Sequence, residues 1–522
     1  MPRGQPIILP PVSAGIRQDQ VPPLLDPTAT LWRSQNVIPR FGEIRLRPGV
    51  TKAAAGGGPG GRIAGGMFYK TVAGGTVHVV VTTNKWWQQS AAGWTDISGG
   101  GTIANDPNHS TRFLVFPSGG VNFLLSVNNV DQPRRFDHTA AASAIIGAAP
   151  DTARDLTSAG NYVLMANVVE SGTRSPSRVR ASALNDPLTW PAGNVWNLNG
   201  EDDIVAIRRL GRTAFIVHKA QSQWIGAAIA GTLPFTIELL EERPGPVSPA
   251  AVVSFGGAQY YLASDYRIYR ATGVGVEAVS DPIDRIFVED ATFGLLGSLK
   301  QRAFGFYRKI DRTIWFVYPA LGQTDPKHAV SYDVRTGAMH THVLPFTVTA
   351  GWPGDDLPSV TWADLASLTW ANIAATYPTW ASMVGTQQPI DFLGSVAGVA
   401  YKFLHDIDDD GTAISASWEY PLAAFAGVDK MQRIDAIESS FEQITGGDAV
   451  TVQVGTSEAN AETAYALNYT TLGTHDTTLT TRQLKTVTDL TTRLASIKYS
   501  VTTSKKMRFR GALLWEWAEG MP

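Results

Sequence analysis

The sequence predicts a mainly β protein: a β-propeller-like body of six or seven blades, a C-terminal β-sandwich and an extended N-terminal arm. Glycine (50 residues) and proline (31 residues) are spread along all 522 residues, as many short strands and tight turns require. A pattern of apolar strand, turn, apolar strand, turn and aromatic strand recurs every ~40–55 residues, which is the period of propeller blades. The last hundred residues instead alternate apolar and polar side chains, as sandwich strands do.

Residues 1–30 predict the extended arm. The segment has no usable hydrophobic period, so we expect it to order against a partner or against the body of the protein. Its prolines exclude a long helix or a central strand: Pro2, Pro6, Pro10, Pro11, Pro22, Pro23 and Pro27. We place the fold boundary near Leu31 and expect that deleting residues 1–30 leaves the melting temperature almost unchanged.

Residues 31–350 predict the propeller blades. Six copies of the strand pattern occupy residues 65–90, 112–139, 159–182, 204–227, 251–272 and 303–342. A seventh copy, residues 392–420, would be the closing blade of the ring. Each blade can bury its sheet faces only against its neighbours, so the copies together predict one closed body.

A tryptophan-rich segment, residues 351–391, interrupts the blade period. Trp362, Trp370 and Trp380 each follow a threonine and are separated by alanine-rich spacers. Large aromatic rings bury much area at low side-chain entropy cost. Two interpretations remain open, an excursion that contacts another protein and an internal flap packed over its own propeller. Residues 421–522 then supply the alternating strands of the predicted sandwich.

Composition limits the chemistry that is expected. Cysteine is absent, which excludes disulfides, thiolate metal sites and cysteine nucleophiles. We predict a soluble, unexported chain with no membrane-spanning segment, because there is no signal-peptide pattern and no apolar run of ~18 residues. Residues 1–60 carry a net charge of +4 and residues 381–522 a net charge of -6, so the two ends are expected to face different surroundings. No dense basic stripe of a nucleic-acid reader is present.

Catalytic motifs are also missing from the sequence. There is no Gly-x-Ser-x-Gly elbow, His-Glu-x-x-His helix or Walker loop, and we predict neither an enzyme nor a cofactor. Adjacent acids such as Asp202 and Asp203 would point to opposite faces of a strand, unlike the paired carboxylates of a glycosidase. His340 and His342 are too few for a zinc site without a third ligand, and we expect a solvated or interface face there.

An acidic loop at residues 406–411 is the sharpest local signal. Asp406, Asp408 and Asp410 before Gly411 match the front half of a calcium loop. The twelfth position is Ser417 rather than a bidentate glutamate, and the flanks read as strands. The alternatives are therefore a calcium site and a glycine-ended hairpin loop.

The segment "LWRSQNVIPRFGEIRLRPGV", residues 31–50, resembles the N-terminal segment of the tail hub and nozzle proteins of short-tailed bacteriophages. The matching positions are Asn36, Val37, Gly42, Arg45, Arg47, Pro48 and Gly49. The repeated Thr-Trp units also resemble the Thr-Trp-Asp-Asp-Leu insertion of such proteins, with Ala363, Ala371 and Ala381 in place of the first aspartate.

The resemblance implies a structural virion protein that assembles as a ring, usually of six copies. The ring would lie in the tail below the portal and the head-to-tail adaptor ring, contact tail fibres or the tail tip, and continue the DNA-ejection channel. Assembly would take place in the host cytoplasm. Trp362, Trp370 and Trp380 would then be interface residues, and the arm would join neighbouring subunits.

Transient contact with double-stranded DNA is implied in the lumen of such a ring. A conduit should not grip phosphates, since each Lys or Arg contact adds affinity, and the 43 Lys and Arg residues among 522 agree with weak retention. Glu201, Asp202 and Asp203 are the candidates for a lumen loop, together with residues 406–411. The alternative function is a glycan-binding or glycan-cleaving propeller of a tail fibre, because tryptophan faces stack on sugars as well as on proteins.

Overall fold

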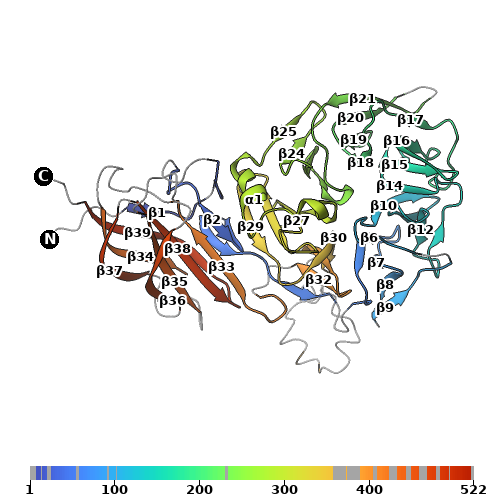
Figure 1. The fold of residues 1–522 in the computed structure, drawn as a ribbon. Coiled ribbons are helices and arrows are strands. Elements are labelled where there is room, and N and C mark those ends of the chain that lie inside the picture. The colour runs from blue at the N-terminus through green and yellow to red at the C-terminus, as the bar shows by residue number, and fades with distance from the viewer. Residues whose placement is uncertain are drawn as a thin grey trace.

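Seven blades and a sandwich make up the molecule in the computed structural model (Figure 1). The structure describes residues 7–12, 14–19, 25–40, 42–53, 58–90, 93–100, 103–229, 233–356, 369, 372, 388–403, 408–421, 432–442, 448–457, 467–477, 482–492 and 494–518. Almost all regular structure in them is β, and α1 (Asp284–Glu289) is a short α-helix that precedes blade 6. Among these residues no helix is long and apolar enough to cross a membrane.

The first four blades follow the chain without interruption. Blade 1 is β6 (Ile63–Lys70), β7 (Thr76–Thr82), β8 (Trp86–Ser90) and β9 (Gly93–Asp96); blade 2 is β10 (Arg112–Ser118), β11 (Val121–Val127), β12 (Arg134–Asp137) and β13 (Ala144–Ile145). Blade 3 is β14 (Thr152–Ala159), β15 (Tyr162–Glu170), β16 (Thr173–Ala181) and β17 (Val195–Asn197); blade 4 is β18 (Ile204–Arg209), β19 (Ala214–Lys219), β20 (Gln223–Ala228) and β21 (Phe235–Glu241).

The remaining blades differ in how they are completed. Blade 5 is β22 (Val252–Phe255), β23 (Ala258–Leu262), β24 (Ile268–Ala271) and β25 (Val276–Ala278); blade 6 is β26 (Phe304–Arg308), β27 (Thr313–Tyr318), β28 (His328–Asp333) and β29 (Met339–Val343). Blade 7 combines β30 (Val348–Asp356), β31 (Gln388–Ser395) and β32 (Ala400–Phe403) with β5 (Val50–Lys52), which comes from the N-terminal part of the chain. Both ends of the propeller sequence therefore meet in one sheet.

The first strands of the blades surround the propeller axis. Strands β6, β10, β14, β18, β22, β26 and β30 contact one another in this order, and β30 contacts β6 to close the ring. Short antiparallel hairpins build blades 1 to 6, in agreement with the spread of glycine turns in the sequence. The predicted mainly β, propeller-like body is confirmed, with seven blades.

The sandwich lies beside the propeller and contains two sheets (Figure 1). One sheet holds β3 (Val37–Arg40), β4 (Glu43–Leu46), β39 (Arg508–Ala518), β34 (Gln432–Phe441) and β37 (Arg482–Thr492), with β1 (Ile7–Leu9) paired to β39. The other holds β2 (Arg33–Gln35), β33 (Ile414–Glu419), β38 (Leu494–Thr503), β35 (Ala449–Ser457) and β36 (Asn468–Asp476). Strand β2 also pairs in parallel with β29, so this second sheet is continuous with blade 6.

Several boundaries differ from those expected from the sequence. Strand β30 begins before the predicted insertion, residues 351–391, and continues into it. Trp352, within the predicted insertion, is therefore a buried residue of blade 7. Strand β33 lies within the predicted closing blade, 392–420, but pairs with β38 of the sandwich, because β5 already fills the fourth place in blade 7. Strands β2 to β4, within the predicted propeller range 31–350, belong to the sandwich.

The N-terminal arm is extended, but it lies on the body of the same chain. Leu9 and Val12 are buried in the sandwich core together with Trp418 and Tyr499, and the Tyr420 hydroxyl donates a hydrogen bond to the Pro10 carbonyl (3.0 Å). The fold boundary near Leu31 is therefore not supported by the packing, because residues before it already contribute apolar area to the core.

Candidate functional sites at the lobe junction and on the propeller axis

The residues that carry the family resemblance meet at the junction between propeller and sandwich. Asn36 separates β2 from β3 in the left-handed conformation (φ 59°), which asparagine tolerates better than most residues. Its side chain donates to the Ser415 carbonyl (2.8 Å) and accepts from the Val343 amide (2.8 Å). Asn36 thus ties β33 of the sandwich to β29 of blade 6.

Arg47 completes this junction. Its guanidinium is buried (2% exposed) and donates to Asn36 Oδ1 (3.0 Å) and to the carbonyls of Pro48 (2.8 Å) and Val343 (3.2 Å). Two further bonds reach both carboxylate oxygens of Asp409 (2.9 and 2.5 Å). A buried ion pair needs this many partners to offset the cost of removing both charges from water.

Gly49 lets the chain pass close to the acidic loop. A Cβ at this position would lie 1.9 Å from the Asp408 carbonyl oxygen, so any larger residue would force the two segments apart. The Val50 amide donates to that same carbonyl (3.1 Å), and the Asp410 amide donates to the Val50 carbonyl (2.7 Å). The Arg-Pro-Gly motif therefore has a packing role in this fold.

The calcium candidates that the structure describes, Asp408 and Asp410, make contacts within the turn at residues 408–411 and with Lys52. Asp406 lies outside the described residues. Asp408 Oδ1 accepts from the Gly411 amide (3.0 Å), and Asp410 Oδ2 pairs with Lys52 Nζ (2.9 Å). No group of three His, Cys, Asp or Glu side chains that could hold a metal ion occurs in the part of the chain that the structure describes. Residues 408–411 therefore make the contacts expected of a glycine-ended hairpin loop, the alternative to a calcium site.

The lumen candidates lie in the connection from blade 3 to blade 4. Asp202 pairs with the fully buried Lys219 (2.7 Å) and accepts from the Gln221 amide (3.0 Å). Asp203 pairs with Arg174 (2.5 Å), while Glu201 is exposed. Two of these three carboxylates therefore stabilise the loop, and Glu201 is the one presented to solvent.

The histidine pair does not lie on a solvated face. His340 and His342 on β29 are both buried. His340 Nδ1 lies 3.2 Å from Ser34 Oγ, and His342 Nε2 lies 2.8 Å from Ser331 Oγ, with its ring stacked on Trp315 at 4.2 Å. Burial lowers the pKa of His340 to about 3. Of the expected solvated or interface face, the solvated alternative was wrong, because both rings are packed inside the chain against side chains of other strands, which the local sequence does not show. The interface candidates Trp362, Trp370 and Trp380 lie outside the described residues.

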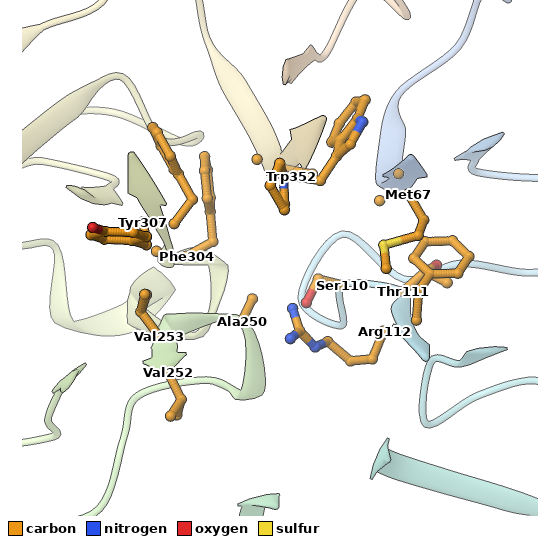
Figure 2. Close-up of a pocket in the computed structure, with 18 of the residues that line it drawn as sticks. Met67, Ser110, Thr111, Arg112, Ala250, Val252, Val253, Phe304, Tyr307 and Trp352 are labelled. Atoms are coloured by element: carbon orange, nitrogen blue, oxygen red, sulfur yellow. The ribbon is translucent and has the colours of Figure 1, made fainter. Parts of the chain in front are cut away.

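A cavity of about 320 Å³ lies among the first strands of blades 1, 2, 5, 6 and 7 (Figure 2). Its wall is mainly apolar, with Met67, Val253, Phe304 and Trp352 among the lining residues. Trp352 is held in place by a hydrogen bond from its Nε1 to His78 Nε2 (3.0 Å). Its indole packs directly on Gly66, where the Cβ of any other residue would lie 2.4 Å from the ring.

Charged groups from three successive blades meet at one side of this cavity. Asp155 on β14 is completely buried and accepts hydrogen bonds from Arg208 and from the Ile207 amide (2.9 Å) on β18. Arg112, at the start of β10, has its Nε 3.6 Å from Asp155 Oδ1. Sequence reasoning missed these residues, although an ionisable side chain inside the first strand of a blade is the signal that could have found them.

One end of the cavity leads to a side-chain network. The cavity shares Ala64, Ser110 and Thr349 with a narrow extension of about 20 Å³. There Arg302 donates to Asn108 Oδ1 (2.9 Å) and to Asp325 Oδ1 (3.2 Å), which also pairs with Arg62 (2.5 Å). Residues from blades 1, 2 and 6 thus narrow the propeller axis at this end.

Comparison with known proteins gives structural neighbours only. No protein-family model matches the sequence, and no curated protein matches it. BamB from Moraxella catarrhalis is 11% identical, with a TM-score of 0.36 over 70% of this chain and 93% of that one. PorZ of Porphyromonas gingivalis, a surface component of the type-IX secretion system, is 10% identical, with a TM-score of 0.38 over 73% of this chain and 44% of that one. A chain of the mitotic checkpoint complex is 8% identical, with a TM-score of 0.39 over 68% of this chain and 96% of that one.

Proposed function

We propose that this chain is a structural subunit of the tail nozzle or hub of a short-tailed bacteriophage. The observation that carries the proposal is the role of the residues behind the resemblance. Asn36, Arg47 and Gly49 build the buried junction that joins sandwich and propeller. A ring that bears load during DNA ejection requires subunits whose two lobes move together. A buried junction between sandwich and propeller would hold the two lobes in a fixed relative position.

In this proposal the DNA passes between subunits rather than through the propeller. The cavity on the propeller axis has a volume of about 320 Å³, and its extension a volume of about 20 Å³. A DNA duplex is wider than its own major groove, which is about 12 Å across, and is too large for this space. A closed ring of copies, usually six in the proteins that the sequence resembles, would enclose a lumen of the necessary width. The sandwich and the outer edges of the blades are then the surfaces available for subunit, adaptor and fibre contacts.

The test is assembly with the neighbouring ring of the tail. Purified protein mixed with its adaptor ring should form a closed ring with a central hole in electron micrographs and a multiple of the subunit mass in native mass spectrometry. Replacing Trp362, Trp370 and Trp380 together by alanine should impair assembly while melting stays cooperative, and Trp87→Ala in blade 1 serves as the control. A chain that stays monomeric and releases reducing sugar from a host polysaccharide would instead support the tail-fibre alternative.

A further inference from the structure

The cavity on the propeller axis has a charge arrangement that the proposed function does not use. Arg112 and Lys309 are the charged side chains among the residues that line it. The carboxylate nearest to Arg112 belongs to Asp155, whose Oδ2 already accepts from Arg208 and from the Ile207 amide. Two guanidinium groups therefore share one carboxylate, and this cluster of Arg112, Arg208 and Asp155 carries one positive charge in excess.

Arg112 is paired with Asp155 through its Nε, which leaves the two terminal nitrogens of its guanidinium for a further partner. Its Nε lies 3.6 Å from Asp155 Oδ1, which is beyond hydrogen-bond length. Its side chain is 26% exposed, and in Figure 2 its terminal nitrogens point into the space between Ser110 and Ala250. Burial lowers the pKa of Arg112 to about 9, so the group is still a cation at neutral pH but is poorly solvated.

The rest of the wall selects the kind of anion. Phe304, Trp352, Val253 and Met67 offer apolar surface opposite and beside the guanidinium (Figure 2), while Lys309, which also lines the cavity, is exposed to solvent. A volume of about 320 Å³ is at the lower end of the range for small-molecule sites. With Lys309 exposed to solvent, Arg112 is the cation set among the apolar side chains, an arrangement that suits a ligand with one negative charge and an apolar body.

We infer that this cavity binds a small organic monocarboxylate, with the carboxylate on Arg112 and the apolar body against Phe304, Val253 and Trp352. The carboxylate receives charge-assisted hydrogen bonds from the two terminal nitrogens of the guanidinium, a geometry that arginine is built to supply. Binding balances the excess positive charge beside Asp155. The site is independent of ring assembly, because every group in it comes from one chain.

Isothermal titration calorimetry of the full chain with sodium phenylacetate tests the inference. We expect one site per chain with a dissociation constant of roughly 0.1–1 mM, and weaker binding in high salt. The neutral isostere phenylacetamide and inorganic phosphate should each bind at least tenfold more weakly, because the first lacks the charge and the second lacks the apolar body. Equal binding of either compound would overturn the inference.

Three variants test whether the ligand binds in this cavity. Arg112→Gln should weaken phenylacetate binding at least tenfold, whereas Arg174→Gln, which removes a cation at the surface, should leave it unchanged. Ser110→Leu keeps Arg112 but fills the space beside its guanidinium and should also abolish binding, so the test stands even if Arg112→Gln does not fold. Binding that survives in a folded Arg112→Gln or Ser110→Leu protein would show that the ligand occupies another site.

Discussion

At the scale of single residues, a few buried polar groups hold segments that are far apart in the sequence. Arg47 and Asp409 form an ion pair across 362 positions, and Asn36 connects to Val343 across 307. A buried pair of this kind contributes specificity of pairing more than net stability, but removing one partner leaves the other charged and desolvated. The cost of breaking such a pair is therefore large even where its formation gains little.

Arg47→Ala should lower the free energy of unfolding by about 3–5 kcal/mol, because it leaves Asp409 buried without a counter-ion. The matched control is Arg45→Ala, two residues away, which breaks a partly exposed pair with Glu43 (2.8 Å) and should cost no more than about 1 kcal/mol. Urea denaturation followed by tryptophan fluorescence measures both. Similar losses in the two variants would contradict the role given to Arg47.

Buried histidines should make the protein sensitive to mild acid. Burial lowers the pKa of His78 and His218 to about 4. The unfolded chain binds protons near pH 6.5 while the folded chain does not, so stability falls as the pH drops from about 6.5 to about 4. Each histidine should cost roughly 2 kcal/mol of unfolding free energy between pH 7 and pH 5.

His218 offers a way to isolate this effect. Its two ring nitrogens contact Gln223 and Gln259. His218→Asn removes the titrating ring, so the variant should lose about 2 kcal/mol less than the wild type between pH 7 and pH 5. Comparing the two proteins matters because burial raises the pKa of Asp391 to about 7, and that carboxyl acts in the opposite direction over the same interval. Identical losses in both proteins would contradict the prediction.

At the scale of elements, strand β1 shows how the arm is attached. It pairs with β39 through residues 7–9 and turns alternate side chains toward the sandwich core and the solvent. Leu9 is completely buried, whereas the adjacent Ile8 is 64% exposed. The arm thus contributes to the core of the sandwich, and deleting residues 1–30 is now expected to lower the melting temperature.

Leu9→Ala should cost about 2–5 kcal/mol of unfolding free energy, the range for truncating a buried leucine. Ile8→Ala on the same strand should cost less than about 0.5 kcal/mol, since its side chain buries little area. Chemical denaturation of both variants distinguishes the packed arm from a loosely attached one. Equal, small effects would restore the independent arm expected from the sequence.

The elements also show what the sequence could and could not predict. Blades 1 to 6 could be predicted because each is a run of short hairpins whose pairings are local, so its pattern is complete within one stretch of sequence. Blade 7 and the sandwich depend on β5 and on β1 to β4, which pair with strands that follow hundreds of residues later. Periodicity contains no information on such partners. The cavity could not be predicted for the same reason, because Phe304 and Arg112 become neighbours only when the ring closes.

At the scale of the whole molecule, propeller and sandwich share one sheet. The pairing of Gln35 with Thr341 continues blade 6 into the sandwich, and the junction around Asn36 lies beside it. We expect the two lobes to unfold in a single calorimetric transition, because neither can lose its strands without exposing the other. A calorimetric enthalpy equal to the van't Hoff enthalpy would establish this for the full chain.

Asn36→Gly should weaken that coupling. Glycine keeps the left-handed backbone but removes the bonds to Ser415, Val343 and Arg47, so the melting transition should broaden or split. Asn161→Gly is the control, since Asn161 has a similar conformation (φ 66°) at an exposed turn and should melt like the wild type. A sharp single transition in Asn36→Gly would show that the shared sheet alone couples the lobes.

The make-up of blade 7 fixes the order of events during synthesis. Strand β5 is translated before any blade, yet its partner β32 follows about 350 residues later. At roughly 5–20 residues per second, a ribosome needs roughly 20–70 s to supply that partner. Until β30 is made, blade 1 presents the side of β6 that β30 will cover, and β5 remains without its partner until β32 follows. The completed ring is therefore a late product of translation: a chain that stops before residue 348 lacks the strand that meets β6, and one that stops before residue 400 lacks the strand that pairs with β5.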